Sequence, residues 1–227
     1  NFSLNSLNTK SSSLESILKS IETAKKDEKI TGIFLEPSII NTGIASSTEI
    51  RNKLNEFKKE TNKFIISYSE VYSQKAYYIA SVSNSVYMHP EGVLDIRGLA
   101  SNALFFTESL ERLGVQPEII RHGKFKSAIE PFTRTNMSQE NREQTKSYMN
   151  DLWNNYLQEV STSRNLNKQV FNKQVENHKI EESKAMFIDS SIYKDQLIDI
   201  LKTKSDNDKL NLITVPEYYE YATKEEK

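Results

Sequence analysis

The sequence predicts an α/β domain with a largely parallel sheet, followed by a mostly helical C-terminal third. Over the first 121 residues, short apolar runs alternate with amphipathic helical segments. This alternation is typical of parallel strands joined by crossover helices. After Ser138 the apolar runs give way to long helical stretches that continue to Lys204.

The predicted strands are short apolar runs bounded by residues that interrupt regular structure. They cover residues 29–35, 64–68, 85–88 and 118–121. Pro37 forbids a simple continuation of the first strand, and Pro90-Glu91-Gly92 is predicted to close the third. Residues 212–215 are predicted as either a last strand or part of a linker.

The predicted helices follow from apolar side chains at helical spacing. The first covers residues 14–26, and its apolar face contains Leu14, Ile17, Leu18 and Ile21. Ser47 or Thr48 is predicted to cap a second helix that ends at Glu60. Gly114 is a natural C-terminal cap for a helix at 103–113. Further helices are predicted at 74–81, 138–164 and 191–204.

Composition excludes several classes of function. The chain has 227 residues and a net charge of −1, so no global field would hold nucleic acid or an anionic membrane. It contains no cysteine, and its three histidines are not spaced as ligands, so neither a metal site nor a cofactor is expected. No apolar run approaches the roughly 20 residues that a membrane helix needs. Because the first residue is Asn, we expect the chain to be an excised, soluble piece of a longer protein.

The stretch from Gly123 to Phe132 is the most informative part of the chain. Lys124 and Lys126 lie beside small and aromatic residues, directly after the predicted strand at 118–121. A turn after a strand is a common place for a reactive side chain. A partly buried lysine in such a turn can lose its proton and act as a base. Position alone equally allows a solvated lysine in a turn.

Further groups of residues extend this stretch in one consistent order along nearly the whole chain. They are Tyr72-Ser73-Gln74, Tyr77-Tyr78-Ile79-Ala80-Ser81, Pro90-Glu91-Gly92, Gly98-Leu99, Lys126-Ser127-Ala128-Ile129-Glu130-Pro131-Phe132, Met137-Ser138, Arg142-Glu143, Leu152-Trp153 and Tyr218-Tyr219-Glu220-Tyr221. Together they resemble the N-terminal repeat of the signal peptide peptidase A (protease IV) family in its long, two-repeat form.

This resemblance implies a fold and a set of boundaries. The fold would be of the Clp-protease/crotonase type, in which ββα units stack into a spiral. Residues 1–204 would form the N-terminal peptidase repeat, with an α/β core at about 1–137 and a helical part at about 138–204. Residues 205–227 would be a linker toward a C-terminal repeat that this sequence does not contain.

The resemblance also implies an activity and its partners. The family consists of bacterial serine peptidases with a Ser–Lys dyad, which degrade cleaved signal peptides. In the long form the lysine comes from the N-terminal repeat and the serine from the C-terminal repeat. Lys126 matches the lysine. We expect peptide substrates, the C-terminal repeat and a homotetramer as partners, at the periplasmic face of the cell membrane, with the anchor outside this chain.

The proposed role makes a demand on Lys126. A free lysine has a pKa of about 10.4, whereas a useful base titrates near about 7–8. Desolvation by Phe125, Phe132 and an apposed domain would lower the pKa, so in the chain alone we expect Lys126 to titrate near its ordinary value. Glu130, four residues on, would oppose this by favouring the charged lysine, and we expect it to point elsewhere, to Arg134 or to the backbone at the Pro131 turn.

The nucleophile is expected to be absent from this repeat. In the family the active serine precedes an aromatic pair by three residues, and that count from Tyr77 leads to Gln74. The loop at 37–43 has one glycine, where the family's oxyanion hole uses Gly-Gly. Ser73 is therefore predicted to be a helix cap, and Tyr77 and Tyr78 to be packing residues.

Two other functions remain open at this point. The first is a non-catalytic module that builds an oligomer, with Lys126 incidental. The second is a crotonase-like acyl-CoA site, which would need two backbone N–H groups on a thioester carbonyl. The missing Gly-Gly loop argues against the second.

Overall fold

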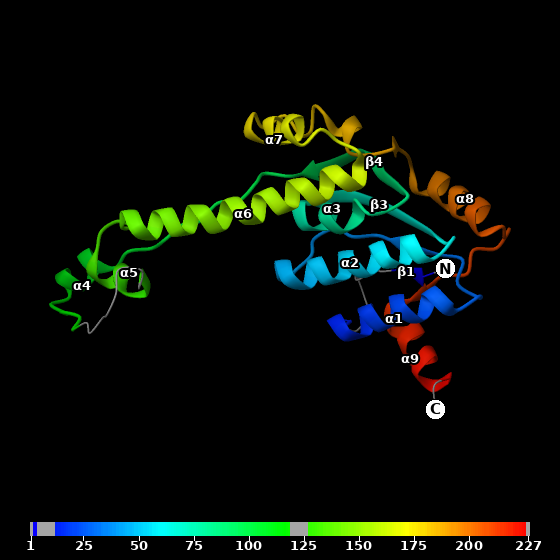
Figure 1. Ribbon diagram of the computed structural model, residues 1–227, viewed down its shortest axis with the longest axis horizontal. Coiled ribbons are helices and arrows are strands. Elements are labelled where there is room, and N and C mark those ends of the chain that lie inside the picture. Colours follow the sequence, from blue (N-terminus) through cyan, green and yellow to red (C-terminus); the bar gives the residue numbers. More distant parts are fainter. Residues whose placement is uncertain (1, 4–11, 119–126, 226–227) are drawn as a thin grey trace. The chain divides into compact units, whose positions relative to one another are not determined.

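The computed structural model describes residues 2–3, 12–118 and 127–225 of the chain. They divide into two compact units, drawn in Figure 1. Unit 1 comprises residues 1–97 and 158–227, and unit 2 comprises residues 98–157.

Unit 1 is built on one six-stranded sheet with the strand order β5-β4-β3-β2-β1-β6. All of its neighbouring strands run parallel. The strands are β1 (Phe2–Ser3), β2 (Gly32–Leu35), β3 (Phe64–Ser73), β4 (Ser85–Asp95), β5 (Ser190–Ser191) and β6 (Ile213–Thr214). The predicted α/β class with a parallel sheet is confirmed.

The helices dominate the second half of the chain, as predicted. They are α1 (Leu14–Lys26), α2 (Ile44–Glu60), α3 (Gln74–Ala80), α4 (Thr107–Arg112), η1 (Ser127–Ile129), α5 (Glu130–Thr133), α6 (Gln139–Arg164), α7 (Lys168–Glu176), η2 (Lys184–Met186), α8 (Lys194–Ser205) and α9 (Val215–Glu225). The two-residue strands β5 and β6 also come from this half, and they form the two edges of the sheet.

Helices cover both faces of the sheet because successive side chains of a strand point to opposite sides. On one face, Leu197 and Leu201 of α8 pack in a buried cluster with Ile66 and Tyr68 of β3. On the other face, the Ser67 hydroxyl lies 2.9 Å from the Tyr72 hydroxyl. The Tyr72 ring in turn meets Tyr77 of α3 edge-on, with ring centroids 6.0 Å apart.

The start of α2 differs from the prediction. The helix begins at Ile44 with Gly43 as its N-cap, about one turn before Ser47. Ser47 lies inside the helix, where its hydroxyl donates to the Gly43 carbonyl at 3.0 Å. The prediction was wrong because a serine can bond the carbonyl four residues back as well as cap a helix.

Strand β4 also differs, because it continues through Pro90 to Asp95. Pro90 is tolerated because it lies in an irregularity of the ladder: Met88 pairs with Ser69 and Val93 pairs with Val71, so Pro90 has no partner in β3 and removes no ladder bond there. Side chains cover the other edge of β4, beyond its pairing with β5. The Leu94 N–H donates to Glu181 Oε2 at 3.2 Å, and Lys184 Nζ lies 3.5 Å from the Pro90 and Gly92 carbonyls.

In unit 2, α4 begins at Thr107, so the predicted start at residue 103 was wrong. Its end follows the prediction. Gly114 has φ +70°, the Val115 N–H donates to the Leu110 carbonyl at 2.9 Å, and the Gly114 N–H donates to the Glu111 carbonyl at 3.1 Å. These two bonds form a Schellman cap, which favours glycine in the left-handed position.

Residues 205–227, expected as a linker, contain β6 and α9. Helix α9 is joined to the segment after α1, because the Tyr218 hydroxyl donates to Asp27 Oδ2 at 2.9 Å. Nearby, Lys29 Nζ donates to the Tyr221 hydroxyl at 2.7 Å. This segment is therefore part of unit 1. That it leads to a C-terminal repeat stays a prediction.

Candidate functional site

Ser73 and Gln74 lie where β3 ends and α3 begins. The Ser73 hydroxyl accepts a 3.4 Å hydrogen bond from the Ala76 N–H and donates to the Ser38 carbonyl at 2.8 Å. Ser73 is thus the N-cap of α3, as predicted. Gln74, which the sequence predicts to lie at the family's nucleophile position, accepts a 3.1 Å bond at Oε1 from the Arg97 N–H. An amide at this position cannot attack a peptide bond as an alkoxide would.

The loop after β2 presents carbonyl groups to the start of α3. The Ser38 carbonyl accepts from Ser73, and the Thr42 carbonyl accepts from Lys75 Nζ at 2.7 Å. An oxyanion hole requires N–H donors, because it must stabilise a developing negative charge. The Ser38 and Thr42 carbonyls are acceptors and cannot serve as such donors.

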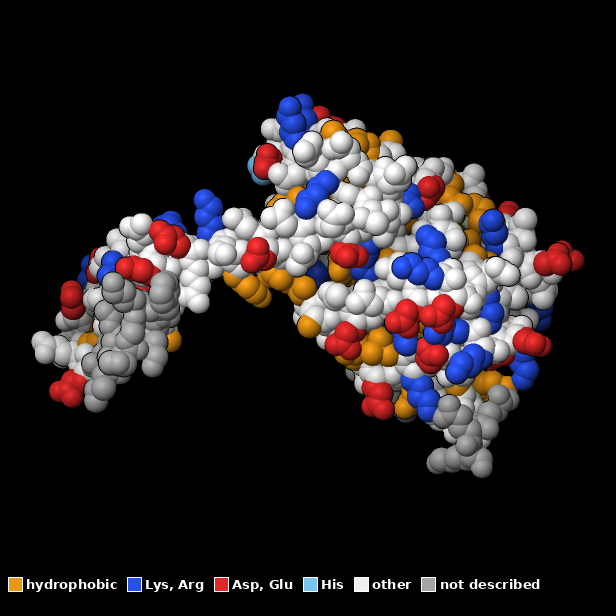
Figure 2. Space-filling view, viewed as in Figure 1, with side chains coloured by type: hydrophobic (Ala, Val, Ile, Leu, Met, Phe, Trp, Pro, Cys, Tyr) orange, Lys and Arg blue, Asp and Glu red, His pale blue; other side chains and the backbone are white. Residues whose placement is uncertain are grey.

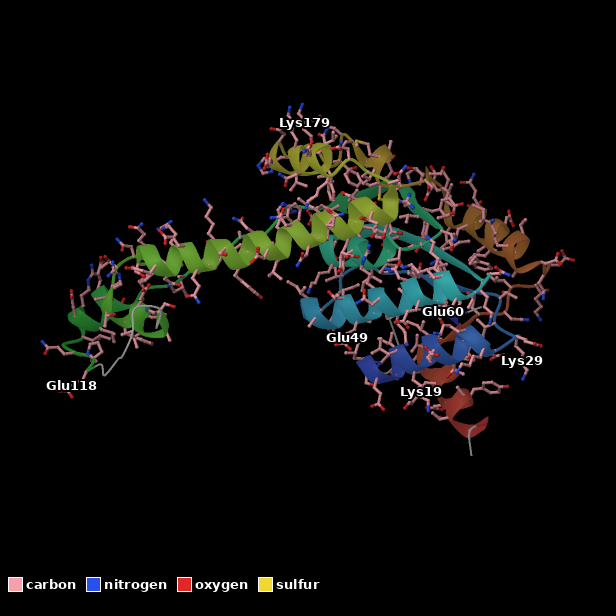
Figure 3. All side chains as sticks on the ribbon, viewed as in Figure 1. Lys19, Lys29, Glu49, Glu60, Glu118 and Lys179 are labelled. Carbon is pink, nitrogen blue, oxygen red and sulfur yellow. The ribbon has the colours of Figure 1, made fainter. Side chains whose placement is uncertain are left out.

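Lys126, the predicted catalytic base, lies outside the described residues, as does Phe125. The same is true of the predicted strand at 118–121, apart from Glu118, which Figure 3 labels. The described chain resumes at Ser127 in η1, which leads directly into α5. Close to this point, Phe132 stacks on Phe106 with ring centroids 6.1 Å apart. Phe132 is 45% exposed, so this surface of unit 2 is apolar and open.

Glu130 is the buried carboxylate next to this segment, with 4% of its surface exposed. It binds the start of α6: the Ser138 hydroxyl donates to Oε1, the Ser138 N–H donates to Oε2 at 3.1 Å, and Asn141 Nδ2 donates to Oε2 at 2.9 Å. Burial opposes ionisation of Glu130, but these bonds outweigh it and hold the pKa of the carboxyl below its ordinary value. Glu130 therefore points to Ser138 and Asn141, not to the Arg134 side chain or the Pro131 backbone that the sequence suggested.

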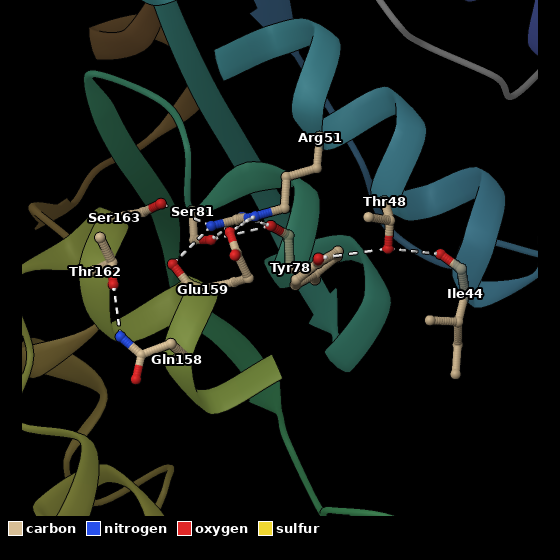
Figure 4. Close-up of polar contacts among 9 residues, drawn as sticks. All are labelled: Ile44, Thr48, Arg51, Tyr78, Ser81, Gln158, Glu159, Thr162 and Ser163. Carbon is tan, nitrogen blue, oxygen red and sulfur yellow. Dashed lines mark hydrogen bonds and ion pairs between the residues drawn. The ribbon is translucent and has the colours of Figure 1, made fainter. Parts of the chain in front are cut away.

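Arg51 of α2 is a fully buried cation that sequence reasoning missed (Figure 4). At the end of α3, its guanidinium donates to the Tyr78 carbonyl and, at 2.7 Å, to Ser81 Oγ. On α6 it donates to the Glu159 carbonyl at 2.8 Å and to Ser163 Oγ at 2.6 Å. Nε lies 3.5 Å from Glu159 Oε2.

A signal in the sequence could have revealed Arg51. The apolar face of the second predicted helix contains Ile50, Leu54 and Phe57. Arg51 lies three residues before Leu54 and four after Ser47, so it belongs to the same face. A lone charged residue on a buried face must find polar partners, because an unpaired buried charge is costly.

Tyr72, Tyr77 and Tyr78 are buried, which confirms the prediction that the aromatic pair of α3 serves packing. The Tyr77 hydroxyl donates to the Phe187 carbonyl at 2.6 Å. Burial raises the pKa of Tyr72 and of Tyr77 far above the ordinary range, so both hydroxyls stay protonated.

Among the residues that the structure describes, no group of histidine and acidic side chains is arranged to hold a metal ion. No helix in the described part of the chain is both long and apolar enough to cross a membrane.

Comparison with known proteins identifies the family. Residues 56–207 match the model of peptidase family S49. The chain belongs to this family. It is 33% identical over 195 residues to Protease 4 of Haemophilus influenzae, a match that covers 85% of this chain and 32% of the relative. It is 37% identical over 158 residues to Protease 4 of Salmonella typhi, covering 69% of this chain and 25% of the relative.

More distant relatives have related names. The chain is 27% identical over 213 residues to the chloroplastic serine protease SPPA of Arabidopsis thaliana, covering 92% of this chain and 31% of the relative. It is 21% identical over 207 residues to a putative signal peptide peptidase SppA of Enterococcus faecium, covering 90% and 59%. The chain therefore spans about a quarter to a third of the two Protease 4 sequences.

Proposed function

We propose that this chain is the base-donating part of a serine peptidase that degrades cleaved signal peptides at a bacterial membrane. Lys126 is the general base, and the nucleophilic serine belongs to a C-terminal repeat outside this sequence. The fold then belongs to the spiral Clp-protease/crotonase type. Membership of family S49 makes the chain part of a peptidase, and the arrangement at the start of α3 supports the division of labour.

This proposal rests on what the structure shows at the predicted nucleophile position, at the start of α3. There, Gln74 bonds the Arg97 backbone, and the loop before it offers carbonyls to the start of α3. A hydrolytic site needs a nucleophile and N–H donors for the oxyanion. Because these residues fill neither role, they support a serine that comes from another part of the protein.

The contacts of Glu130 support Lys126 as the base. Both carboxylate oxygens already accept bonds from Ser138 and Asn141. A carboxylate that is satisfied in this way has less to gain from pairing with an ammonium, so it favours the charged form of Lys126 less. Desolvation by a covering partner can then lower the pKa of Lys126 toward neutrality.

The exposed apolar side chains of unit 2 support a partner that covers it. Leu104 is 74% exposed, Leu113 is 76% exposed and Phe132 is 45% exposed. Apolar groups of this size favour burial against another surface. We infer that the C-terminal repeat or another subunit of a homotetramer covers them, at the periplasmic side of the membrane, with the anchor outside this chain.

Lys126→Ala in the full-length protein tests the proposal. Loss of a general base typically costs about 10²–10⁴-fold in rate, so peptide hydrolysis should fall by at least 10²-fold, and a serine-directed phosphonate should no longer label the protein. Ser73→Ala is the matched control and should keep full activity, because Ser73 caps a helix. Undiminished hydrolysis by Lys126→Ala would remove the proposal.

The same experiment separates the alternative function. If the chain is only an oligomerisation module, Lys126→Ala retains both labelling and hydrolysis, whereas substitution of the exposed Leu104 and Leu113 by Ser breaks the assembly. Under the main proposal, Lys126→Ala leaves the assembly intact and stops catalysis. Size-exclusion chromatography with light scattering measures the assembly.

A further inference from the structure

Tyr68 of β3 has a buried hydroxyl for which the described residues offer no hydrogen-bond partner. The residue is 1% exposed, and it packs in the cluster that contains Leu197 and Leu201 of α8. A buried hydroxyl without a partner lowers the stability of a fold, and a ligand that supplies the missing bond removes this cost. Tyr68 follows Ser67, which pairs with Leu35, the last residue of β2. It therefore lies at the carboxyl ends of parallel strands, where open α/β sheets bind their ligands.

Three carboxylates act on this hydroxyl. Burial, followed by the negative charges of Glu70, Glu36 and Asp195, raises the pKa of Tyr68. Glu36 directly follows β2, Glu70 is in β3, and Asp195 lies in the first turn of α8. The fold of unit 1 thus brings acidic side chains from three places to one neutral donor. These three carboxylates and the Tyr68 hydroxyl are called the acidic site below.

Lys194 at the start of α8 shows which chemistry the acidic site accepts. Its Nζ lies 2.5 Å from Glu36 Oε1. The Glu36 side chain is 18% exposed, whereas the Lys194 side chain is 56% exposed. An exposed lysine in such a pair contributes little to stability, so a basic group from a ligand can displace it. Lys194 is therefore a stand-in, from the chain itself, for the amine or guanidinium of a ligand.

An apolar pair of side chains follows the acidic site along β3. Val71 of β3 pairs with Val93 of β4, and they are 39% and 48% exposed. Val71 precedes Tyr72, which faces α3, so the two valines lie on the face that α8 covers in part. The shift of register between Ser69 and Val71 places Tyr68 on this face as well. The acidic site and the apolar pair therefore share one face of the sheet.

We propose that the acidic site binds the basic end of a peptide substrate, whose apolar part lies over Val71 and Val93. This inference rests on the proposed function, because a signal peptide has a basic segment followed by about 7–15 apolar residues. The basic side chain takes the place of Lys194 on Glu36, and the Tyr68 hydroxyl donates to a carbonyl of the peptide. The carboxylates select the charge, while the two valines bury apolar surface of the peptide.

Two synthetic peptides test the inference. Each contains about ten leucines and alanines, preceded by two lysines in one peptide and by two glutamines in the other. Binding is measured by fluorescence anisotropy on the full-length protein with Lys126→Ala, which should not cleave them. The Kd of the lysine peptide should be about fivefold lower than that of the glutamine peptide. Equal Kd values for the two peptides would overturn the inference.

Paired substitutions separate the acidic site from the general charge of the surface. Glu36→Gln should reduce the preference for lysine to less than about twofold, whereas Glu49→Gln on α2 (Figure 3) should keep it. Lys194→Met should strengthen binding of the lysine peptide by about two- to fivefold, because it removes the internal competitor. Lys202→Met, in the last turn of α8, should not. Equal responses within both pairs would contradict the site.

Tyr68→Phe gives a readout that a purely structural role would not produce. It removes a hydroxyl that has no partner among the described residues, so the thermal midpoint should stay the same or rise. The Kd of both peptides should nevertheless increase by about three- to tenfold, because the bond to the peptide carbonyl is lost. Unchanged binding of both peptides would show that the hydroxyl does not bind them and would overturn its role.

Hydrolysis of the same peptides decides the proposed function separately. If Lys126→Ala still cleaves them at full rate, the proposed function fails, and the KM ratios of the two peptides replace the Kd ratios as the test of the acidic site. If Lys126→Ala is inactive and Glu36→Gln keeps the preference for lysine, only the acidic site fails.

Discussion

Unit 1 and unit 2 differ most in what they bury. In unit 1, large side chains such as Phe57, Tyr77, Phe171 and Phe187 are fully buried. Within the described residues of unit 2, only Glu130 and Leu157 are buried, while Leu104 and Leu113 stay about three-quarters exposed. Because burial of apolar surface is the main force in folding, unit 1 contains the stabilising core of the chain. In its described residues, unit 2 relies on caps and buried polar bonds.

The largest effect is expected when the same substitution, leucine to alanine, is made once in each unit and the two results are compared. Leu54 is fully buried in unit 1, and Leu104 is 74% exposed in unit 2. Leu54→Ala should lower the free energy of unfolding by about 2–5 kcal/mol, because it removes contacts and leaves a cavity. Leu104→Ala should change it by less than about 0.5 kcal/mol. Urea denaturation followed by circular dichroism measures both, and a comparable loss from Leu104→Ala would contradict the contrast.

Glu130→Gln tests the polar bonds that organise unit 2. The substitution removes the charge and, with it, the charge-assisted bonds from Ser138 and Asn141. The free energy of unfolding of this unit should therefore fall by about 1–2 kcal/mol at pH 7. The pKa of Glu130 is below its unfolded value of about 4.3. The stabilisation is therefore complete above that value and is lost as the pH falls through the folded pKa.

The measurement for this variant is local. Hydrogen exchange of the amides at the start of α6 should accelerate in Glu130→Gln, while exchange in β3 and α2 of unit 1 should not change. At a pH below the folded pKa of Glu130 the variant and the wild type should converge. Faster exchange throughout unit 1 would show that the units unfold together.

Ser73→Ala should have a moderate effect within unit 1. It removes the N-cap of α3 and the bond to the Ser38 carbonyl, which together should contribute about 1 kcal/mol. Ser73→Asp is the matched variant, because aspartate also caps helices, and it should recover most of the loss. Thermal unfolding compares the three proteins; no loss in Ser73→Ala would show that the cap is dispensable.

The smallest effect is expected from the charges on the surface of unit 1. Acidic and basic side chains alternate over α1 and α2 (Figure 2). Glu22 Oε2 lies 2.9 Å from both Lys53 Nζ and Lys25 Nζ, and Lys25 Nζ also lies 2.7 Å from Glu60, which Figure 3 labels at the end of α2. Hydrogen bonds from Lys53 and then Lys25 lower the pKa of Glu22 to about 2.

Glu22→Gln should lower the free energy of unfolding by less than about 1 kcal/mol at low salt, because solvent screens ion pairs at the surface. The folded pKa is below the unfolded one, so this stabilisation is complete above about pH 5 and is lost as the pH falls toward 2. Addition of 1 M NaCl should remove most of the difference between wild type and variant in urea denaturation. A difference that persists in salt would contradict the surface character of this cluster.

Strands β2 and β3, the start of β4 and most helices could be predicted because their signals are local, whereas the two-residue strands β1 and β5 were missed. The apolar runs of β2 and β3 and the helical spacing of α1 are read directly from neighbouring residues. The errors have two causes. The extension of β4 through Pro90 depends on an irregularity in its pairing with β3, which is a non-local feature. The start of α2 depends on a choice between two local hydrogen-bonding roles of Ser47.

The candidate site divides in the same way. Ser73 could be predicted as a cap, because capping depends on the residue and the helix that follows it. Arg51 was missed because its partners Ser81 and Ser163 are 30 and 112 residues away in the sequence. The direction of Glu130 toward Ser138 and Asn141 also depends on a contact between two elements. Lys126 came from the resemblance to a family and stays a prediction.

The covered edge of β4 has a consequence for association between molecules. Exposed edges of sheets recruit strands from other chains and seed aggregates. Here Pro90 offers no donor, and Glu181 and Lys184 occupy the neighbouring backbone groups with charges. When the protein is heated or concentrated, aggregation should therefore begin at the exposed apolar surface of unit 2 and not at this edge of the sheet.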